Sequence, residues 1–326
     1  MAKVTFGNDP RTLQEAIVFF SDYDNCHRAV SEIRWPDGVV ACPTCGSEKV
    51  TYLASARVWK CYGKHPRAKF SLKVGTIFED SAIPLQKWLP ALWLLTNCKN
   101  GISSYELARA LGVTQKTAWF MLSRLRMALH VGHTDRMGGH VEADETFIGG
   151  KARNMHAAKR KRLGISQSKS MIGKVAVMGL LQRHGTDGSQ VRTQVIANRK
   201  KHQLEQIVGA HVEAGAALYT DALRSYDRMA ARGYVHNVID HAEAYVDGAV
   251  HTNGLENFWS LLKRALKGTY VNVEPFHLFR YLDEQAFRFN KRKLSDAARF
   301  VLALNGIIGK RLTYNALTGS ELPQTC

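Results

Sequence analysis

Three acidic residues stand in settings that suit metal-assisted chemistry. Asp144 lies in HVEADETFIGG, Asp221 in AALYTDALRSY and Glu256 in HTNGLENFWSLLKRAL. The first two follow short apolar runs typical of β-strands, and the third lies at the start of an amphipathic helix. Carboxylates at strand ends and at a helix start can converge on one point. Such a cluster binds Mg²⁺ (or Mn²⁺), which predicts phosphodiester chemistry.

Each acid also has a simpler explanation, because most acidic residues are surface charges or helix caps. Asp221 could cap a helix that begins at Ala222, and Glu145 competes with Asp144. The joint pattern favours the metal site. Lys263 strengthens it, because it follows Glu256 by two helical turns and could reach a phosphate beside the metals.

The charge of the chain favours nucleic acid as the partner. The 326 residues include 45 Lys and Arg but only 28 Asp and Glu, which gives a formal net charge of +17. A basic excess of this size is typical of DNA-binding and RNA-binding proteins. We find no apolar run of the roughly 20 residues that a membrane span needs and no signal-peptide core, so we expect a soluble, cytoplasmic protein that binds no membrane.

A cysteine and histidine cluster predicts a structural zinc site. Cys42 and Cys45 form a CPTCG knuckle, and Cys61 and His65 follow within the next twenty residues. Zn²⁺ takes four such ligands in a tetrahedron when its role is structural. The second pair is less specific, because Cys61 and His65 could be ordinary strand and loop residues.

Residues 103–126 have the pattern of a helix-turn-helix. Ser103 or Ser104 can cap the first helix, Gly112 allows the turn, and Thr114 can cap the second helix. This arrangement predicts DNA contacts at the start of the second helix and further along it, although a plain helical hairpin has a similar pattern. The candidate residues are Gln115, Lys116, Thr117 and Arg124.

Residues 151–174 contain eight Lys or Arg and no acid, which predicts a loop that is either solvated or bound to DNA phosphates. The candidate DNA contacts here are Lys159, Arg160, Lys161 and Arg162, and on the last amphipathic helix Asn253 and Arg264.

The order of elements predicts an α/β chain. We expect N-terminal helices and a zinc ribbon in residues 1–80, a helical DNA-binding domain in 81–135, a mixed-sheet catalytic domain in 136–295, and a C-terminal tail in 296–326. Within the catalytic domain the patterns predict helices at 201–212 and 222–232 and strands near 140, 173–182, 190–197, 215–220 and 234–239.

The motifs HVEADETFIGG, LYTDALRSY and HTNGLENFWSLLKRALKGTY together resemble the core of DDE-class insertion-sequence transposases, in particular the bacterial group related to Merlin elements. The segment RWPDGVVACPTCGS…WKCYGKHPRAKF is similar to the zinc ribbon that precedes this core. The resemblance covers residues 10–295 and implies an RNase H-like core with two Mg²⁺ ions. Asp144, Asp221 and Glu256 match its metal-binding triad, and Lys263 matches its helix lysine.

The resemblance leaves one position open, because some relatives place Asn where others use an acid. Asn253 is therefore the alternative to Glu256 as the third residue. The family implies that the enzyme nicks the element ends, at their terminal inverted repeats, and joins the freed 3′-hydroxyls to target DNA, without a covalent protein intermediate. Two ends must be joined, so the resemblance implies a homo-oligomer on DNA.

Two rival functions remain on the sequence alone. A zinc ribbon with a helix-turn-helix would suffice for a non-catalytic DNA-binding regulator, which leaves the acidic trio without a role. An RNase H-like nuclease would cut nucleic acid without joining strands.

Overall fold

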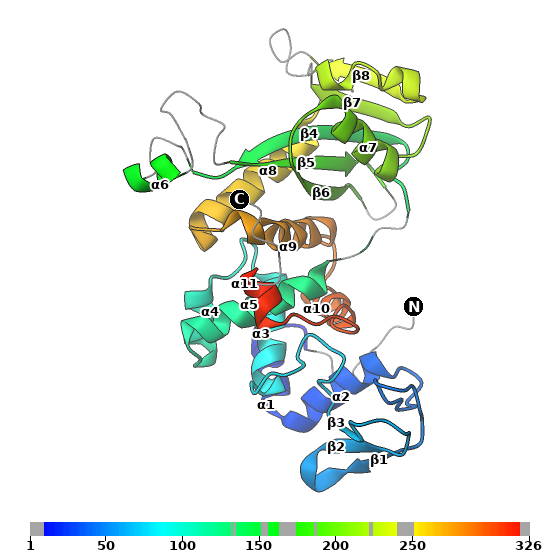
Figure 1. Cartoon of the computed structure of the whole chain (residues 1–326), viewed down its shortest axis with the longest axis vertical. Coiled ribbons are helices and arrows are strands. Elements are labelled where there is room, and N and C mark those ends of the chain that lie inside the picture. Colours follow the sequence, from blue (N-terminus) through cyan, green and yellow to red (C-terminus); the bar gives the residue numbers. More distant parts are fainter. Residues whose placement is uncertain are drawn as a thin grey trace. The chain divides into compact units, whose positions relative to one another are not determined.

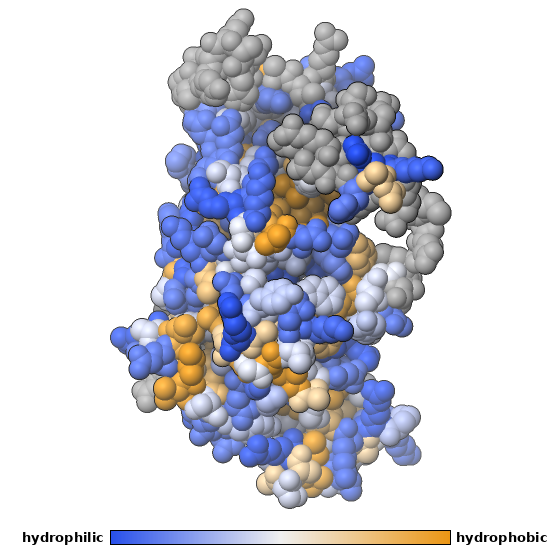
Figure 2. Space-filling view, turned by 90° about the vertical axis from the view of Figure 1, so that its left-hand side faces the viewer, coloured by the Kyte–Doolittle hydropathy of each residue, from blue (hydrophilic) through white to orange (hydrophobic). Residues whose placement is uncertain are grey.

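A computed structural model of the chain describes residues 10–130, 132, 135–150, 156–162, 174–185, 188–221, 224–239 and 251–319 (Figure 1). The chain divides into two compact units, Met1–Val131 together with Lys291–Cys326, and Gly132–Asn290. In the part that the structure describes, no helix is both long and apolar enough to cross a membrane. On the face drawn in Figure 2, hydrophilic side chains predominate and the hydrophobic ones form small separate areas.

The first unit begins with helices whose first turns are capped by side chains. Thr12 and Ser103 each form a capping box with the glutamate three residues later, and Thr114 accepts a hydrogen bond from the backbone of Thr117. The helices are α1 (Leu13–Ser21), α2 (Tyr23–Arg34), α3 (Leu85–Asn97), α4 (Ser104–Leu111) and α5 (Gln115–Leu129).

Between α2 and α3 lies a small antiparallel sheet of β1 (Val50–Leu53), β2 (Val58–Cys61) and β3 (Lys69–Phe70). Trp59 of β2 stacks on Phe70 at 5.7 Å and on His27 of α2 at 5.3 Å, measured between ring centroids. These aromatic contacts attach the sheet to α2 and supply most of its core, because strands this short bury little else.

The C-terminal stretch differs from the expected tail. Residues 291–319 include α10 (Asp296–Asn305) and α11 (Tyr314–Thr318), and α10 packs on α3, α2 and α5. Phe300 of α10 lies 5.2 Å from Phe20 of α1 and 5.3 Å from Trp93 of α3, again between ring centroids. The end of the chain therefore completes the helical core of the first unit.

The second unit is built on a mixed sheet, in agreement with the expected fold class. Its described strands run in the order β6-β5-β4-β7-β8, with β4, β5 and β6 antiparallel and β7 and β8 parallel to β4. The strands are β4 (His140–Ile148), β5 (Val175–Gln182), β6 (Gln190–Ile196), β7 (Ala217–Asp221) and β8 (Val235–Ile239).

Helices cover both faces of this sheet (Figure 1). On one face, α7 (Lys201–His211) packs against Val141 and Ala143 of β4 and Met178 of β5. On the other face, α8 (Asn253–Ala265) and α9 (Leu278–Asn290) pack against Val177 and Leu181 of β5. Side chains alternate between the faces of a strand, so Glu142 and Asp144 face α8 whereas Glu145 faces the opposite side.

Two expectations for this unit need correction. The predicted helix at 222–232 consists, where the structure describes it, of two short 3₁₀ turns, Arg224–Tyr226 and Ala230–Arg232. The basic stretch predicted to be a loop contains a short helix, α6 (Ala157–Arg162), because Ala-Ala-Lys-Arg-Lys-Arg has high helix propensity. The rest of that stretch, except Lys174 and His156, lies outside the described residues.

Candidate active site, zinc site and DNA-binding helices

The strand register brings Asp144 and Asp221 to the same level of the sheet. Strands β4 and β7 pair in parallel, and Glu142 lies opposite Tyr219. Asp144 stands two residues beyond Glu142, and Asp221 two residues beyond Tyr219. Both carboxylates therefore project on the same face at neighbouring positions, toward the side covered by α8.

The surroundings of Asp144 raise the pKa of its carboxyl group. Burial raises its pKa to about 6, and the negative charges of Asp221 and Glu256 contribute to that rise. Hydrogen bonds from the Trp259 indole N–H (2.9 Å) and from the backbone N–H of Glu145 (2.8 Å) lower the pKa in part. Two negative charges that act on a third carboxylate favour an added cation, and carboxylate oxygens suit Mg²⁺ or Mn²⁺.

Trp259 reaches Asp144 because Gly179 leaves room for it. Gly179 of β5 is the register partner of Asp144, and a Cβ atom there would lie 2.6 Å from the Trp259 ring. Trp259 is buried on the inner face of α8, and helical periodicity gives no sign of its hydrogen bond to Asp144. A glycine in the centre of an apolar strand was the available signal.

Glu145 has a separate environment on the other face of β4. It accepts a hydrogen bond from the Tyr226 hydroxyl, and Arg199 Nη1 lies 4.0 Å from its Oε2. Burial raises the pKa of Glu145 to about 7, with smaller contributions from Asp221 and Asp144. Its partners on the α7 side distinguish it from Asp144, which faces α8.

Glu256 lies in the first turn of α8, and Asn253 is the first residue of that helix. Glu256 is close enough to raise the pKa of Asp144 and accepts a hydrogen bond from the Thr252 hydroxyl at 3.5 Å. Asn253 is exposed. The choice of Glu256 over Asn253 as the third metal ligand remains a prediction.

Lys263 lies along a cleft of about 590 Å³ rather than among the acids. The cleft is lined by Phe147 and Ile148 at the end of β4, and by Lys174 and Lys267. Lys263 follows Glu256 by seven residues, about 10 Å along the helix axis. Arg264 is exposed.

Replacing Asp144 with Asn is expected to stabilise the protein in the absence of divalent metal. The folded-state pKa of Asp144 is raised from 3.8 to about 6. The folded protein therefore binds more protons than the unfolded chain between about pH 4 and pH 6, and stability falls as pH rises through this window. A shift of about two units corresponds to an upper bound of about 3 kcal/mol. Asn keeps an acceptor for Trp259.

Thermal unfolding without added Mg²⁺ checks this prediction. The Asp144→Asn variant should unfold at a higher temperature than wild type at pH 7.5 and at the same temperature at pH 4. No gain at pH 7.5 would contradict the buried, metal-free carboxylate described above.

The four residues of the predicted zinc site lie together. The candidate ligand atoms of Cys42, Cys45, Cys61 and His65 all lie within 4.8 Å of one another. Cys42 Sγ is 3.4 Å from His65 Nε2, and Cys45 Sγ is 3.6 Å from Cys61 Sγ. Tetrahedral Zn²⁺ ligands at ordinary bond lengths are separated by roughly 3.3–3.8 Å, so this set fits zinc.

Gly63 completes the zinc cradle. A Cβ atom at this position would lie 2.8 Å from Cys45 Sγ, and the Gly63 N–H donates to Cys61 Sγ at 3.2 Å. Burial raises the pKa of the Cys42 thiol, but backbone N–H groups of Thr44 and Cys45 and the neighbouring thiols more than offset this and bring it to about 7. Thiolate at neutral pH is the form that binds metal.

The second helix of the predicted helix-turn-helix, α5, begins where the sequence indicated. Gly112 adopts a left-handed conformation (φ +60°) between α4 and α5. Lys116 is exposed, whereas Gln115 donates a hydrogen bond to Ser104 and Thr117 interacts with the Thr114 hydroxyl at 2.9 Å. Lys116 is therefore the most available of these three for DNA.

The prediction that Arg124 contacts DNA is wrong. Its side chain is only 4% exposed, and it donates hydrogen bonds to the carbonyl groups of Ile77 and Glu79. Its guanidinium also lies 4.4 Å from the centre of the Phe120 ring. Arg124 therefore fastens the 77–79 segment to α5.

Two substitutions on α5 should separate folding from DNA binding. Arg124→Met leaves two buried carbonyl groups without a donor, so we expect about 2–4 kcal/mol of destabilisation. Lys116→Ala should leave stability unchanged and weaken DNA binding with a shallower salt dependence, by about one unit of slope. Thermal unfolding and fluorescence anisotropy at several salt concentrations measure the two effects. Equal stability of Arg124→Met and wild type would contradict the role given to Arg124.

The remaining predicted DNA contacts lie on α6 and on α8, where Asn253 and Arg264 are both exposed. Lys161 is exposed and Arg160 half-buried, while the side chains of Lys159 and Arg162 lie outside the described part of the chain. Their binding to DNA remains a prediction.

Comparisons with known proteins agree with this arrangement. Residues 136–290 match the family described as an ISXO2-like transposase domain, and residues 21–63 match a transposase zinc-ribbon domain. The zinc-ribbon match contains Cys42, Cys45 and Cys61 of the zinc site and ends two residues before His65. The sheet described above is thus the RNase H-like core of a DDE domain.

Two curated relatives are similar to the chain. One is described as an uncharacterized protein in transposable element ISH50 of Halobacterium salinarum, 30% identical over 269 residues, which cover 80% of this chain and 88% of the relative. The other, an uncharacterized transposase-like protein of Haemophilus influenzae, is 30% identical over 105 residues, which cover 32% of this chain and 85% of the relative. With its zinc-ligand cluster, its mixed sheet and these matches over most of its length, the chain belongs to the insertion-element transposases with an ISXO2-like transposase domain.

Proposed function

We propose that this transposase cuts the ends of its element and joins the freed 3′-hydroxyls to target DNA by two-metal chemistry. The observation that carries the proposal is the convergence of Asp144, Asp221 and Glu256, in which Asp221 and Glu256 both raise the pKa of Asp144. When bound, two Mg²⁺ ions would activate the attacking hydroxyl and stabilise the leaving oxygen.

The role of the protein residues is to hold the metals and the DNA strand. Asp144 and Asp221 offer carboxylate oxygens from adjacent parallel strands, and Glu256 offers one from the facing helix. The Trp259 hydrogen bond holds one oxygen of Asp144 and favours its ionised form, which is the form that binds a metal.

The lysines of the cleft support a path for the DNA backbone beside this centre. Lys174, Lys263 and Lys267 line it, and none of the described residues that line it is acidic. Together with the net charge of +17, they favour binding of several phosphates and a steep salt dependence. We propose that the zinc ribbon and α4–α5 bind the terminal inverted repeats, and that a homo-oligomer holds two ends.

The test is incubation of the purified protein with an oligonucleotide duplex of the element end and a plasmid target. We expect nicking at the repeat boundary and joining to the plasmid, both dependent on Mg²⁺ or Mn²⁺ and both abolished by an excess of a chelator. Cutting without joining would favour a nuclease. Sequence-specific binding without any cutting would favour a regulator.

A further inference from the structure

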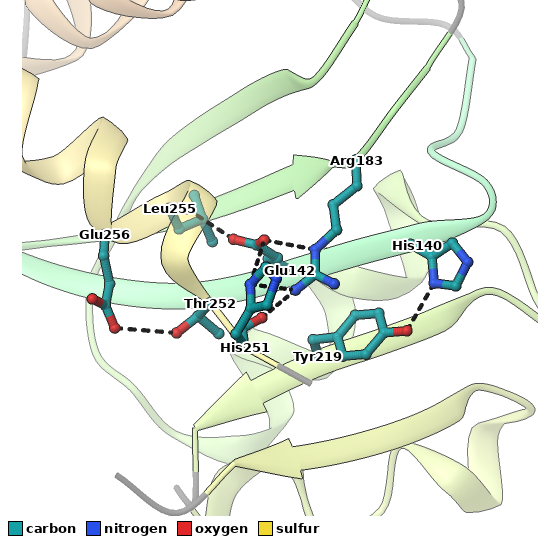
Figure 3. A network of polar contacts seen from close by, with 8 residues as sticks. All are labelled: His140, Glu142, Arg183, Tyr219, His251, Thr252, Leu255 and Glu256. Carbon is teal, nitrogen blue, oxygen red and sulfur yellow. Dashed lines mark hydrogen bonds and ion pairs between the residues drawn. The ribbon is translucent and has the colours of Figure 1, made fainter. Parts of the chain in front are cut away.

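Arg183, which follows β5 directly, lies at the centre of a buried polar network, which Figure 3 draws together with Glu256. Its Nε donates to Glu142 Oε1 at 2.7 Å, and its Nη2 lies 3.0 Å from His251 Nδ1 and donates to the His251 carbonyl oxygen. The side chains of Arg183 and Glu142 are 8% and 1% exposed. A buried carboxylate of this kind requires a cation, and Arg183 supplies it.

Glu142 uses its second oxygen to hold the start of α8. The backbone N–H of Leu255, in the first turn of the helix, donates to Glu142 Oε2 at 2.8 Å. The side chain of the N-cap residue Thr252 makes no capping hydrogen bond to α8. Glu142 of β4 therefore accepts a hydrogen bond from a backbone N–H of the first turn that has no partner within the helix. Gly254 permits the approach, because a Cβ atom there would lie 2.9 Å from Glu142 Oε2.

The network also reaches β7. The guanidinium of Arg183 lies 4.2 Å from the centre of the Tyr219 ring, and the Tyr219 hydroxyl is 2.7 Å from His140 Nδ1. The His140 carbonyl accepts the backbone N–H of Arg183 at 2.8 Å. One set of contacts thus connects β4, β7 and the first turn of α8.

Each of these three elements carries one acid of the proposed metal site. Asp144 stands two residues beyond Glu142 in the sequence, and Asp221 two beyond Tyr219. Glu256 stands one residue beyond Leu255, and Figure 3 draws both. We propose that Arg183 and Glu142 are positioning residues, which fix the exposed Glu256 against the two strand acids so that the three can bind metal together. This inference rests on the proposed function, since it concerns the same metal site.

The charges of the three acids explain why α8 must be held in place by Arg183 and Glu142. The charges of Asp221 and Glu256 both act against the ionised form of Asp144, and Glu256 is exposed on α8. If the first turn of α8 moved away, that repulsion would be relieved and the metal site would be lost. Residues that orient ligands in this way typically contribute roughly 10–100-fold in metal affinity.

Metal binding in the absence of DNA tests the proposal independently of transposition. Trp259 is the single tryptophan in residues 132–290 and hydrogen-bonds to Asp144, so Tb³⁺ bound at the trio should give emission sensitised through it. Tb³⁺ shares the preference of hard cations for carboxylate oxygen. Loss of the emission in Trp259→Phe and in Asp144→Asn identifies the signal in the full-length protein.

We expect Arg183→Met to weaken Tb³⁺ binding at least about tenfold. It should raise the Mn²⁺ concentration for half-maximal cleavage by a similar factor, with little change in the rate at saturating Mn²⁺. The matched control is Arg192→Met, which removes another buried arginine of the same unit, paired with Asp135 at 3.0 Å. Its Tb³⁺ affinity should equal that of wild type.

Arg183→Lys covers the case in which the Met variant does not fold. A lysine keeps the charge but lacks the planar guanidinium that contacts Glu142 and His251 together. We therefore expect Tb³⁺ affinity to fall several-fold in this variant. Wild-type Tb³⁺ affinity in a folded Arg183 variant, or an equal loss in Arg192→Met, overturns the proposal. If wild type binds Tb³⁺ and Arg183→Met does not, while neither cuts DNA, the positioning role stands and the proposed reaction fails.

Discussion

Replacing Asp221 with Asn is expected to reduce Mg²⁺-dependent cleavage of element-end DNA by about a thousandfold or more while leaving DNA binding intact. The substitution removes one negative charge from a site built of three carboxylates, and with it an oxygen ligand from the end of β7. Loss of metal-based stabilisation of the transition state costs several kcal/mol, and each 1.4 kcal/mol is about a factor of ten in rate.

The same loss is expected for Asp144→Asn and Glu256→Gln, but not for Asn253→Ala. A matched control is Glu213→Gln, which alters an exposed acid of the same unit. Single-turnover cleavage and anisotropy-based DNA binding should be measured on each variant. Full cleavage activity in Asp221→Asn or Glu256→Gln would refute the assignment of the trio. A larger loss of activity in Asn253→Ala than in Glu256→Gln would make Asn253, not Glu256, the third residue.

Removing the zinc ligands should unfold the ribbon while leaving the second unit folded. The double substitution Cys42→Ser/Cys45→Ser deletes two of four ligands whose candidate atoms lie within 4.8 Å of one another. Structural zinc contributes roughly 10–16 kcal/mol to domains of this kind. The strands β1–β3 are too short to replace that contribution, although Trp59 provides a small aromatic core.

Zinc content by mass spectrometry and hydrogen exchange of residues 42–70 check this expectation. Protection of the ribbon should disappear in the double variant, whereas protection of β4 and β5 should persist. Cys98→Ser is the control, since Cys98 lies outside the cluster. A double variant with the full zinc content of wild type would contradict the site.

The sequence was most informative where the signal is local. Four-ligand spacing predicted the zinc cluster, and Ser103, Gly112 and Thr114 marked the ends of α4 and α5 to within a residue. Capping and turn formation depend on a few neighbouring residues, so their pattern survives without knowledge of the fold. The short apolar run before Asp221 likewise predicted a strand end, whereas the same prediction for Asp144 is wrong, because Asp144 lies in the middle of β4.

Local patterns failed where a side chain meets a distant partner. Arg124 has the position of a recognition-helix residue, yet it is buried against carbonyl groups of residues 77–79. The sequence assigned the residues of α10 to a C-terminal tail, whereas in the structure Phe300 of this helix contacts Phe20 and Trp93. In both cases the surrounding partners come from segments far along the chain, which periodicity cannot identify.

The acid trio shows both sides of this division. The types and spacing of Asp144, Asp221 and Glu256 follow from the sequence, as do the strand-end position of Asp221 and the helix-start position of Glu256. The structure alone separates Asp144 from Glu145, because side-chain alternation on β4 sends one toward α8 and the other toward Tyr226. It alone joins Glu142 to Arg183, 41 residues apart. Strand register and helix docking set these contacts, and both depend on long-range packing that no local segment encodes.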